Sequence, residues 1–273
     1  MTKNITNMSS PNTKKVLIVG IDSAIGEALR EFLMRDSYIV QGTTRRSNFI
    51  DKDIYFLDLM EPSLDIFEKK FDSVIICAGV TSISKCEEEF ELSKTINVTN
   101  TIKIIDKAVS DDSFVIFISS NSVFDGSKSF YKYTDQTNPT TLYGQFKNSV
   151  EQHILSNAFN KACILRITKV ITKNSAFIRK WEISAQKKTA IEAFNNILIS
   201  PIRIETVVQS LKLLINKEEA GLFQLGGDKE ISFYDYAKDY FSSNKRSLSL
   251  IKSSRNTLVP KGVIHNSLAS HLP

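Results

Sequence analysis

Glycine is scarce in this sequence, with 10 among 273 residues, about half of the roughly 7% of average usage. The three cysteines, Cys77, Cys86 and Cys163, are odd in number and show no CxxC spacing, which argues against a disulfide framework and a zinc cluster. No stretch approaches the ~20 consecutive apolar residues of a membrane span, and residues 1–14 lack the apolar centre of a signal peptide. These absences predict a soluble, reduced, cytoplasmic protein with no bound metal and no membrane contact.

Charge of one sign is not strongly in excess. Lys and Arg number 35 against 30 Asp and Glu, for a formal net charge of +5. The lysines stand singly or in pairs, and no basic run is interleaved with the aromatic residues that nucleic-acid binding would favour. We therefore expect no nucleic-acid partner, while attraction for an anionic small molecule stays open.

The length supports one large domain or two unequal ones, with a core large enough to be stable without disulfide bonds or metal ions. Short apolar, β-branched runs alternate with segments of helical period, which predicts an α/β fold of the Rossmann type with a doubly wound parallel sheet. Continuously apolar strands are typical of strands buried on both faces. The expected strands are 16–19, 38–42, 54–57, 73–77, 114–119 and 162–167, and the expected helices are 24–33, 87–109 and 143–159.

After about residue 168 this rhythm changes. Helices are expected at 176–186 and 205–216 and from about 232, with short strands near 189–193, 197–199 and 222–225, while the last thirty residues look irregular. We predict three parts. They are a flexible N-terminal segment (1–14), an NAD(P)-binding Rossmann domain (15–168) and a smaller α/β substrate-binding region (169–273) interleaved with the Rossmann core.

The first expected strand runs directly into Gly20-Ile-Asp-Ser-Ala-Ile-Gly26 and then into a helix. Free backbone N–H groups and the helix dipole at such a turn form a site for a pyrophosphate. Ser23 stands at the middle position, where the dinucleotide fingerprint has glycine. The same spacing also occurs in ordinary strand-to-helix connections, but its place after the first strand favours a dinucleotide site.

The second expected strand ends in Thr43-Thr44-Arg45-Arg46, and no carboxylate appears before Asp51. An acid at this point would hold the ribose 2′-hydroxyl of NAD. Guanidinium groups instead grip a phosphate bidentately, so the pattern favours NADPH. NADH, with the arginines as ordinary surface charges, is the alternative.

Tyr143 and Lys147 are four residues apart in an expected helix, which places them on one face. A lysine cation there favours the phenolate and lets the tyrosine act as an acid or base near neutrality. The spacing alone is uninformative, since Tyr234 and Lys238 share it. Only Tyr143 follows a buried strand ending in Ser120 within the nucleotide-binding half; Tyr234 is assigned to packing or surface.

Several further segments, in this order, resemble the extended short-chain dehydrogenase/reductase superfamily and, within it, the dTDP-4-dehydrorhamnose reductase-like branch. The most specific is Ile118-Ser-Ser-Asn-Ser-Val-Phe-Asp-Gly126, close to that branch's I-S-T-D-Y-V-F-D-G. The likeness runs from Lys15 to about Leu268. Supporting segments are 74–81, 86–87, 97–101, 138–139, 143–144, 164–166, 200–201 and 221–226.

The resemblance implies roles for particular residues. Tyr143 would protonate the sugar oxygen while NADPH delivers hydride, Lys147 would bind the nicotinamide ribose and lower the tyrosine pKa, and Ser120 would hydrogen-bond the reacting oxygen. The other cofactor-binding residues implied are Gly20, Ser23, Ala24, Ile25 and Gly26 at the pyrophosphate, Arg45 and Arg46 at the 2′-phosphate, Asp58 and Leu59 at adenine, and Ala78, Gly79 and Thr81 at the nicotinamide. Besides Ser120, the implied substrate-binding residues are Asn121, Lys169 and Arg203, and Asn97 matches a helix residue near the active site.

Three departures from that branch bear on function. Ser23 replaces a glycine, so we expect the phosphate site to differ there. Asn121 and Ser122 replace Asp-Tyr, and the missing acidic pair argues against a 4,6-dehydratase. Lys169 replaces an aromatic residue near the sugar, which puts rhamnose itself in doubt. Both Lys169 and Arg203 are candidates for nucleotide phosphates, with ordinary surface charge as the alternative.

The leading hypothesis is an NADPH-dependent reductase of a nucleotide-linked 4-keto sugar in the synthesis of surface glycan or polysaccharide precursors. The alternatives are an epimerase with tightly bound NAD and a catalytically idle, nucleotide-binding regulatory subunit. Dimers are common in the superfamily, so a homodimer is open, although no isolated apolar helix face requires one. Five of the ten glycines fall in the proposed motifs (Gly20, Gly26, Gly79, Gly126 and Gly144), which supports backbone requirements there.

Overall fold

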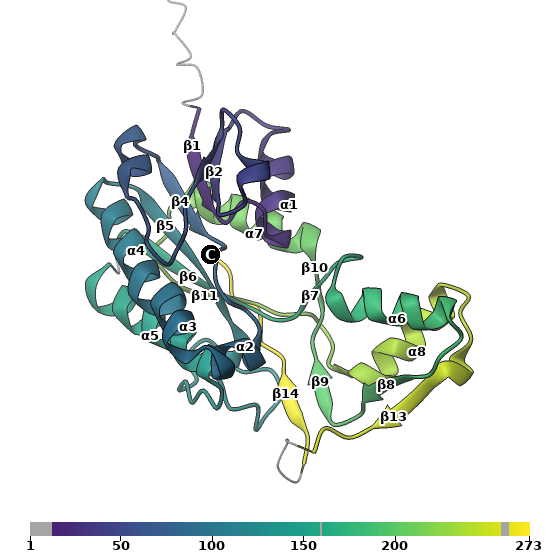
Figure 1. Ribbon diagram of the computed structural model, residues 1–273. Coiled ribbons are helices and arrows are strands. Elements are labelled where there is room, and N and C mark those ends of the chain that lie inside the picture. The colour runs from purple at the N-terminus through teal and green to yellow at the C-terminus, as the bar shows by residue number, and fades with distance from the viewer. Residues whose placement is uncertain (1–12, 159, 258–261) are drawn as a thin grey trace, which may run out of the picture.

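A seven-stranded parallel sheet forms the centre of the larger lobe (Figure 1). The computed structural model describes residues 13–158, 160–257 and 262–273, so most of the segment expected to be flexible (1–14) lies outside the described residues. The strands, in spatial order, are β11 (Gly221–Leu225), β6 (Ala162–Ile167), β5 (Phe114–Ser120), β4 (Ser73–Ile76), β1 (Lys15–Val19), β2 (Ile39–Thr44) and β3 (Ile54–Phe56). All neighbouring pairs are parallel, which confirms the predicted Rossmann-type fold.

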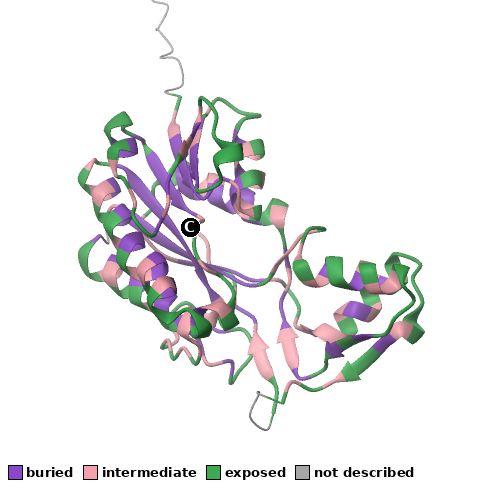
Figure 2. Cartoon of the chain, in the orientation of Figure 1, coloured by how far each residue is buried: buried purple, intermediate pink, exposed green. Residues whose placement is uncertain are grey.

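Helices cover both faces of this sheet. On one face lie α1 (Ala24–Leu33) and α7 (Ile204–Lys217), and on the other lie α4 (Thr101–Ser110) and α5 (Leu142–Asn157) (Figure 1). Every residue of β5 is buried, and its side chains alternate, with Ile116 in the core under α7 and Phe117 in the core under α5. Figure 2 shows the buried sheet inside partly exposed helices. Burial on both faces explains why the strands read as continuous apolar runs.

The prediction of one continuous helix over 87–109 is wrong. The chain forms α2 (Ile83–Glu88), α3 (Phe90–Lys94), a π-helical segment, η3 (Thr95–Asn100), and then α4. Single π turns inside helices are rare in proteins, and those that exist are often located at functional sites. Here the π turn carries Asn97, whose contacts are described below.

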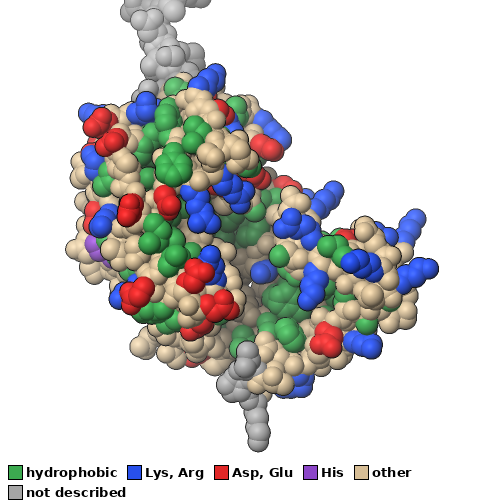
Figure 3. Space-filling view, viewed as in Figure 1, with side chains coloured by type: hydrophobic (Ala, Val, Ile, Leu, Met, Phe, Trp, Pro, Cys, Tyr) green, Lys and Arg blue, Asp and Glu red, His purple; other side chains and the backbone are tan. Residues whose placement is uncertain are grey.

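The smaller lobe packs α6 (Ala176–Gln186) and α8 (Phe233–Ser243) around an aromatic core that includes Trp181 and Phe241. Two small sheets connect it to the larger lobe. The strands outside the central sheet are β7 (Val170–Ile171), β8 (Ile191–Phe194), β9 (Ile197–Ile199), β10 (Ile202–Arg203), β12 (Ile231–Ser232), β13 (Ile251–Ser254) and β14 (Ile264–Asn266). Short 3₁₀ turns occur along the whole chain, at η1 (Ser47–Phe49), η2 (Asp65–Lys69), η4 (Asn121–Val123) and η5 (Leu248–Leu250). Figure 3 shows a hollow between the lobes with Lys and Arg side chains on both sides.

The last thirty residues were expected to be irregular, but they include the strands β13 and β14 and cross between the lobes. We call residues 264–272 the C-terminal strap. Its first residues form β14, which pairs with β9, and its last residues lie along the edge strand β11, where His271 and Gln224 exchange two backbone hydrogen bonds of 2.8 Å. Leu272 packs against the core under α7. The strap therefore holds the two lobes together.

Within the described part of the chain, no helix is long and apolar enough to cross a membrane. Nor do the described residues bring together three or more His, Cys, Asp or Glu side chains in an arrangement that could hold a metal ion.

Candidate active site

The turn between β1 and α1 needs both of its glycines. Gly20 has φ +83°, and a Cβ there would lie 2.8 Å from the backbone of Ala78. A Cβ on Gly26 would lie 2.4 Å from the Gly20 carbonyl oxygen. No side chain fits at either distance, so the chain can pass closely between β1, β4 and α1 only with glycine at these positions.

Ser23 does not need to be glycine, because its backbone is extended (φ −78°, ψ 158°). Its side chain caps α1, with Oγ accepting a hydrogen bond of 3.1 Å from the Gly26 N–H. The first two helical N–H groups, those of Ala24 and Ile25, have no partner within a helix and are the groups suited to an anion. The phosphate site was expected to differ at Ser23, and the difference is that the Ser23 side chain caps the helix and occupies the Gly26 N–H.

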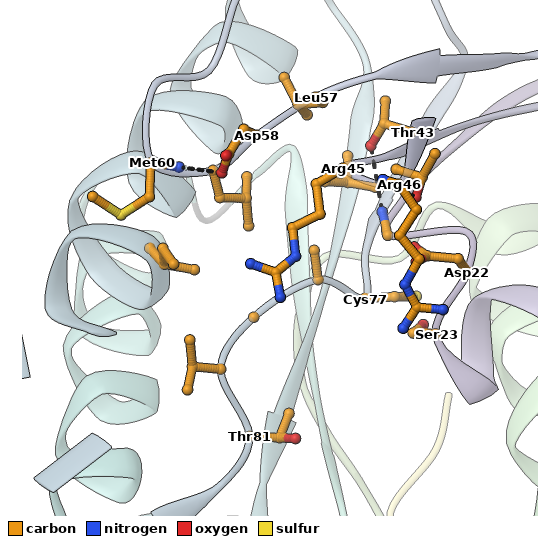
Figure 4. A pocket seen from close by; sticks show the side chains of 18 of the residues that line it. Asp22, Ser23, Thr43, Arg45, Arg46, Leu57, Asp58, Met60, Cys77 and Thr81 are labelled. Carbon is orange, nitrogen blue, oxygen red and sulfur yellow. Dashed lines mark hydrogen bonds and ion pairs between the residues drawn. The ribbon is translucent and has the colours of Figure 1, made fainter. Parts of the chain in front are cut away.

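A cleft of about 420 Å³ opens at the carboxyl ends of β1, β2 and β4 (Figure 4). Of the residues predicted to bind the cofactor, those that line it are Gly20, Ser23, Arg45, Arg46, Asp58, Leu59, Ala78, Gly79 and Thr81. Ala24, Ile25, Gly26, Tyr143 and Lys147 are not among its lining residues. The cleft also includes Asp22, Cys77 and Lys85, which the sequence analysis did not assign.

The two arginines after β2 have different surroundings. The Arg45 side chain extends into the cleft (Figure 4). Arg46 instead makes an ion pair with Asp22, with Nε 3.1 Å from Oδ2, and its guanidinium lies 5.6 Å from the centroid of the Phe49 ring. Asp22 could have been suspected from the sequence, since it lies inside the glycine-containing turn, but its pairing with Arg46 depends on the fold.

Asp58 and Leu59, which follow β3, form one wall of the cleft. The Asp58 carboxylate accepts a hydrogen bond of 2.9 Å from the Met60 N–H, and the buried Asn100 amide donates to the carbonyl oxygens of Leu59 (2.8 Å) and Met60 (2.9 Å). The π-helical segment that ends at Asn100 therefore fixes this wall.

Asn97 fixes the loop after β4 in the same way. Its Oδ1 accepts from the Val80 N–H (2.8 Å) and its Nδ2 donates to the Val80 carbonyl oxygen (2.9 Å). This pair of bonds sets the path of the segment that carries Ala78, Gly79 and Thr81 along the cleft.

The predicted catalytic residues meet where β5 ends and α5 begins. Thr141 caps α5 by accepting a hydrogen bond of 3.1 Å from the Gly144 N–H. The Ser120 hydroxyl donates to Ser122 Oγ at 3.2 Å, and the Ser120 side chain also lowers the pKa of the Tyr143 hydroxyl. Lys147 is buried, donates to the Ile118 carbonyl oxygen at 2.8 Å, and has Nζ 5.9 Å from the centroid of the Tyr143 ring. Three residues far apart in sequence thus form one cluster.

Burial has a strong effect on the pKa values of Tyr143 and Lys147. Burial raises the pKa of Tyr143 to about 12, against the opposing effect of the Ser120 side chain. Burial also lowers the pKa of Lys147 to about 8, although Cys77 and Glu151 act to raise it. Burial disfavours the phenolate and raises the Tyr143 pKa overall, while the predicted lowering of that pKa by Lys147 stays a prediction. At neutral pH Tyr143 keeps its proton and is suited to donate it.

The predicted substrate residues are not all in one place. The Asn121 amide donates to Oδ1 of Asn266 in the strap (2.9 Å). Lys169 follows β6, with Nζ 5.7 Å from the ring of Phe177 in α6; it is exposed overall, yet burial of its ammonium lowers its pKa. The Arg203 side chain is 82% exposed and pairs with Glu205 at 3.3 Å, which favours the alternative of a surface charge.

Comparisons with known proteins agree on one group. The family model described as RmlD substrate binding domain matches residues 14–263. The chain is 24% identical to methionine adenosyltransferase 2 subunit beta of Bos taurus over 83% of this chain and 71% of that protein. It is 25% identical to dTDP-4-dehydrorhamnose reductase of Aggregatibacter actinomycetemcomitans over 82% of this chain and 76% of that protein.

A similar solved structure is the dTDP-4-dehydrorhamnose reductase of Bacillus anthracis in complex with NADP. It matches with a TM-score of 0.84 and 19% identity, over 96% of this chain and 91% of that one. At that identity the match establishes the shared fold.

Proposed function

The chain belongs to the RmlD substrate binding domain family, and from that membership and its site we propose that it is an NADPH-dependent reductase of a nucleotide-linked 4-keto sugar. The observation that carries the proposal is the grouping of the half-buried Tyr143 with the buried Ser120 and Lys147 beside the cleft. The relatives named as dTDP-4-dehydrorhamnose reductases support a sugar nucleotide as substrate. A place in the synthesis of surface glycan or polysaccharide precursors is part of the same proposal.

The residues of the cleft fit a phosphorylated dinucleotide. Gly20 and Gly26 let the turn pack closely between β1, β4 and α1, and the free N–H groups at the N-terminus of α1 would then hold a pyrophosphate. Arg45 extends into the cleft and would hold a 2′-phosphate. When bound, NADPH supplies a hydride to the keto carbon.

The chain's own residues supply the proton and the orientation. Tyr143 would donate the proton on its hydroxyl to the substrate oxygen, so that a carbonyl that gains a hydride at carbon and a proton at oxygen becomes an alcohol. Ser120, whose side chain acts on the Tyr143 hydroxyl, would hydrogen-bond the same oxygen. The charged Lys147 would bind the nicotinamide ribose and favour the phenolate that remains after proton transfer.

The direct test is to incubate the protein with NADPH and a panel of nucleotide-linked 4-keto sugars and to follow loss of NADPH absorbance. We expect oxidation of NADPH with at least one of them and formation of the matching alcohol. If no member of a broad panel causes oxidation, the proposal fails.

A regulatory subunit is the second candidate, because one relative of similar identity is named as the beta subunit of methionine adenosyltransferase 2. This hypothesis requires that the chain binds a nucleotide without turnover of a sugar substrate. A stoichiometric partner co-purifying with the chain, together with no activity on the sugar panel, would favour it. Retention of Ser120, Tyr143 and Lys147 in one cluster supports the enzyme instead.

Replacing Arg45 with alanine is expected to weaken NADPH binding by about 10- to 100-fold, since a hydrogen bond to a charged group contributes about 1.5–3 kcal/mol. NADH binding should stay nearly unchanged, because NADH has no 2′-phosphate. Fluorescence titration of both cofactors measures the two affinities. Arg46→Ala is the matched comparison and should have a smaller effect, since Arg46 neutralises Asp22. Equal losses for NADPH and NADH in Arg45→Ala would contradict the assignment.

A further inference from the structure

Lys169 stands where the chain passes from the larger lobe to the smaller one. It follows the last residue of β6 by two positions, and its ammonium lies 5.7 Å from the centroid of the Phe177 ring in α6. In open α/β sheets, ligands bind outside the carboxyl ends of the strands, and β6 ends here. The Lys169 ammonium therefore lies between the two lobes, where Figure 3 shows the hollow.

Lys169 is also close to the proposed catalytic cluster. Ile167, two residues earlier, is the register partner of Ser120 on the neighbouring strand β5. Two residues of extended chain span at most about 7 Å. A substrate whose reacting oxygen is at Ser120 would therefore have Lys169 beside it.

The backbone on both sides of Lys169 is fixed by hydrogen bonds. The Thr168 N–H donates to the Leu225 carbonyl oxygen at 3.1 Å, and the Lys169 carbonyl oxygen accepts from the Ile202 N–H at 2.9 Å. Val170, the next residue, pairs with Ile202 in the two-stranded sheet of β7 and β10. A backbone held in this way positions a side chain more precisely than a free loop does.

The aromatic neighbour of Lys169 is fixed as well. The Phe177 ring meets Trp181 and Phe233 edge to face, with centroids 5.0 Å and 5.6 Å away. A cation within about 6 Å of a ring centroid is attracted to it, but a ring has no charged oxygen with which to neutralise an ammonium. Phe177 therefore supports the Lys169 side chain and leaves its charge unpaired.

The charge of Lys169 differs in this from other cations near the site. Within the described part of the chain, no hydrogen bond or ion pair holds its ammonium, and burial alone lowers its pKa. A lysine with only a surface role keeps its charged head in water. Lys147 is also buried, but its ammonium donates to the Ile118 carbonyl oxygen, and Arg203 pairs with Glu205. Lys169 thus combines a partly dehydrated charge with the lack of a partner among the described residues.

We propose that Lys169 binds an oxyanion of the sugar-nucleotide substrate, carried either by its diphosphate or by a carboxylate on its sugar. Both groups offer the same chemistry, a negatively charged oxygen that accepts hydrogen bonds from an ammonium. Such an oxyanion supplies the partner that no described residue supplies, so Lys169 selects for negative charge on the substrate. The inference rests on the proposed function for the identity of that substrate, but it can be measured without turnover.

The experiment measures binding of dTDP, dTDP-glucose, UDP-glucose and UDP-glucuronic acid by isothermal titration calorimetry, with and without NADPH. None of these probes has a keto group to reduce. Lys169→Met should weaken binding of at least one probe by about 10- to 100-fold, since hydrogen bonds to charged groups are the stronger ones. Lys169→Arg keeps the charge and should keep most of the affinity. Lys180→Met removes the same charge from an exposed position on α6 and should bind every probe as the wild type does.

The four probes distinguish the two sources of the oxyanion. If the diphosphate is the partner, Lys169→Met weakens binding of all four by a similar factor. If a carboxylate on the sugar is the partner, the wild type binds UDP-glucuronic acid more tightly than UDP-glucose. Lys169→Met then loses this preference and binds the other three probes as the wild type does.

Thermal unfolding tests the unpaired charge separately. Burial of a charge without a partner costs free energy, so Lys169→Met should be at least as stable as the wild type. A clear loss of thermal stability in this variant would mean that Lys169 holds the fold together, and it would contradict the proposal.

The outcomes separate this proposal from the proposed reductase. Binding that depends on Lys169, in a wild-type protein that oxidises NADPH with no 4-keto sugar, would overturn the reductase and leave the oxyanion site supported. Wild-type affinity of Lys169→Met for every probe, or no binding of any probe by the wild type, would overturn the oxyanion site, whatever the activity on 4-keto sugars.

Discussion

Replacing Tyr143 with phenylalanine is expected to lower turnover by about 10²- to 10⁴-fold, the usual contribution of a positioned general acid. The change removes the hydroxyl that is proposed to donate the proton and keeps the ring. NADPH affinity should change little, since Tyr143 does not line the cleft that is proposed to hold the cofactor. Steady-state kinetics on the best 4-keto sugar and fluorescence titration with NADPH measure the two quantities separately.

The chain contains its own control for this substitution. Tyr234 and Lys238 have the same spacing on α8, with the Lys238 ammonium 5.0 Å from the centroid of the Tyr234 ring, but they lie in the smaller lobe. Tyr234→Phe should leave turnover near the wild-type value. Full turnover in Tyr143→Phe would remove the assigned proton donor, and a change confined to KM would give Tyr143 a part in binding only.

Replacing Gly144 with alanine should reduce both stability and activity. A Cβ at this position would lie 2.0 Å from the Ser122 carbonyl oxygen and 3.0 Å from Cβ of Pro139, and a backbone oxygen cannot rotate away as a side chain can. Added atoms in a well-packed region cost about 1–3 kcal/mol. Displacing α5 also moves the adjacent Tyr143, and a misplacement near 1 Å can lower a rate about 10²-fold.

Thermal unfolding and turnover of Gly144→Ala check this prediction together. Gln145→Ala is the matched control, since Gln145 is exposed and lies one residue further along the same helix. Wild-type stability and turnover in Gly144→Ala would mean that α5 and the loop at Ser122 are not packed as closely as described.

The parallel sheet could be predicted because its signal is local. Strands such as β5 are buried on both faces, and this burial produces an apolar run that the sequence shows directly. The break in the helix predicted over 87–109 could not be predicted in the same way. The π turn at Asn97 accompanies hydrogen bonds to Val80, a residue on a separate loop that periodicity within the helix does not detect.

The grouping of the three proposed catalytic residues was predictable for a related reason, since Ser120 ends a strand and Tyr143 and Lys147 share one helix face. Their proton affinities were not. The pKa of Tyr143 depends on how deeply the folded chain buries it, and spacing on a helix contains no measure of burial.

Long-range polar pairs were missed for the same physical reason. Arg46 meets Asp22 and Arg166 meets Glu151 only because neighbouring strands and the helices above them bring these residues together. Arg166 lies inside a run that was interpreted as an apolar strand, and one charge in such a run gives no indication of its partner.

The C-terminal strap has a consequence for how the sheet meets other chains. An edge strand with free N–H and C=O groups is a template for pairing with a second molecule, and proteins avoid this with short or covered edges. Here one edge of the sheet is β3, which spans only Ile54–Phe56, and the opposite edge, β11, is engaged by His271 of the strap. The strap thereby protects the sheet against edge-to-edge aggregation at its longer edge.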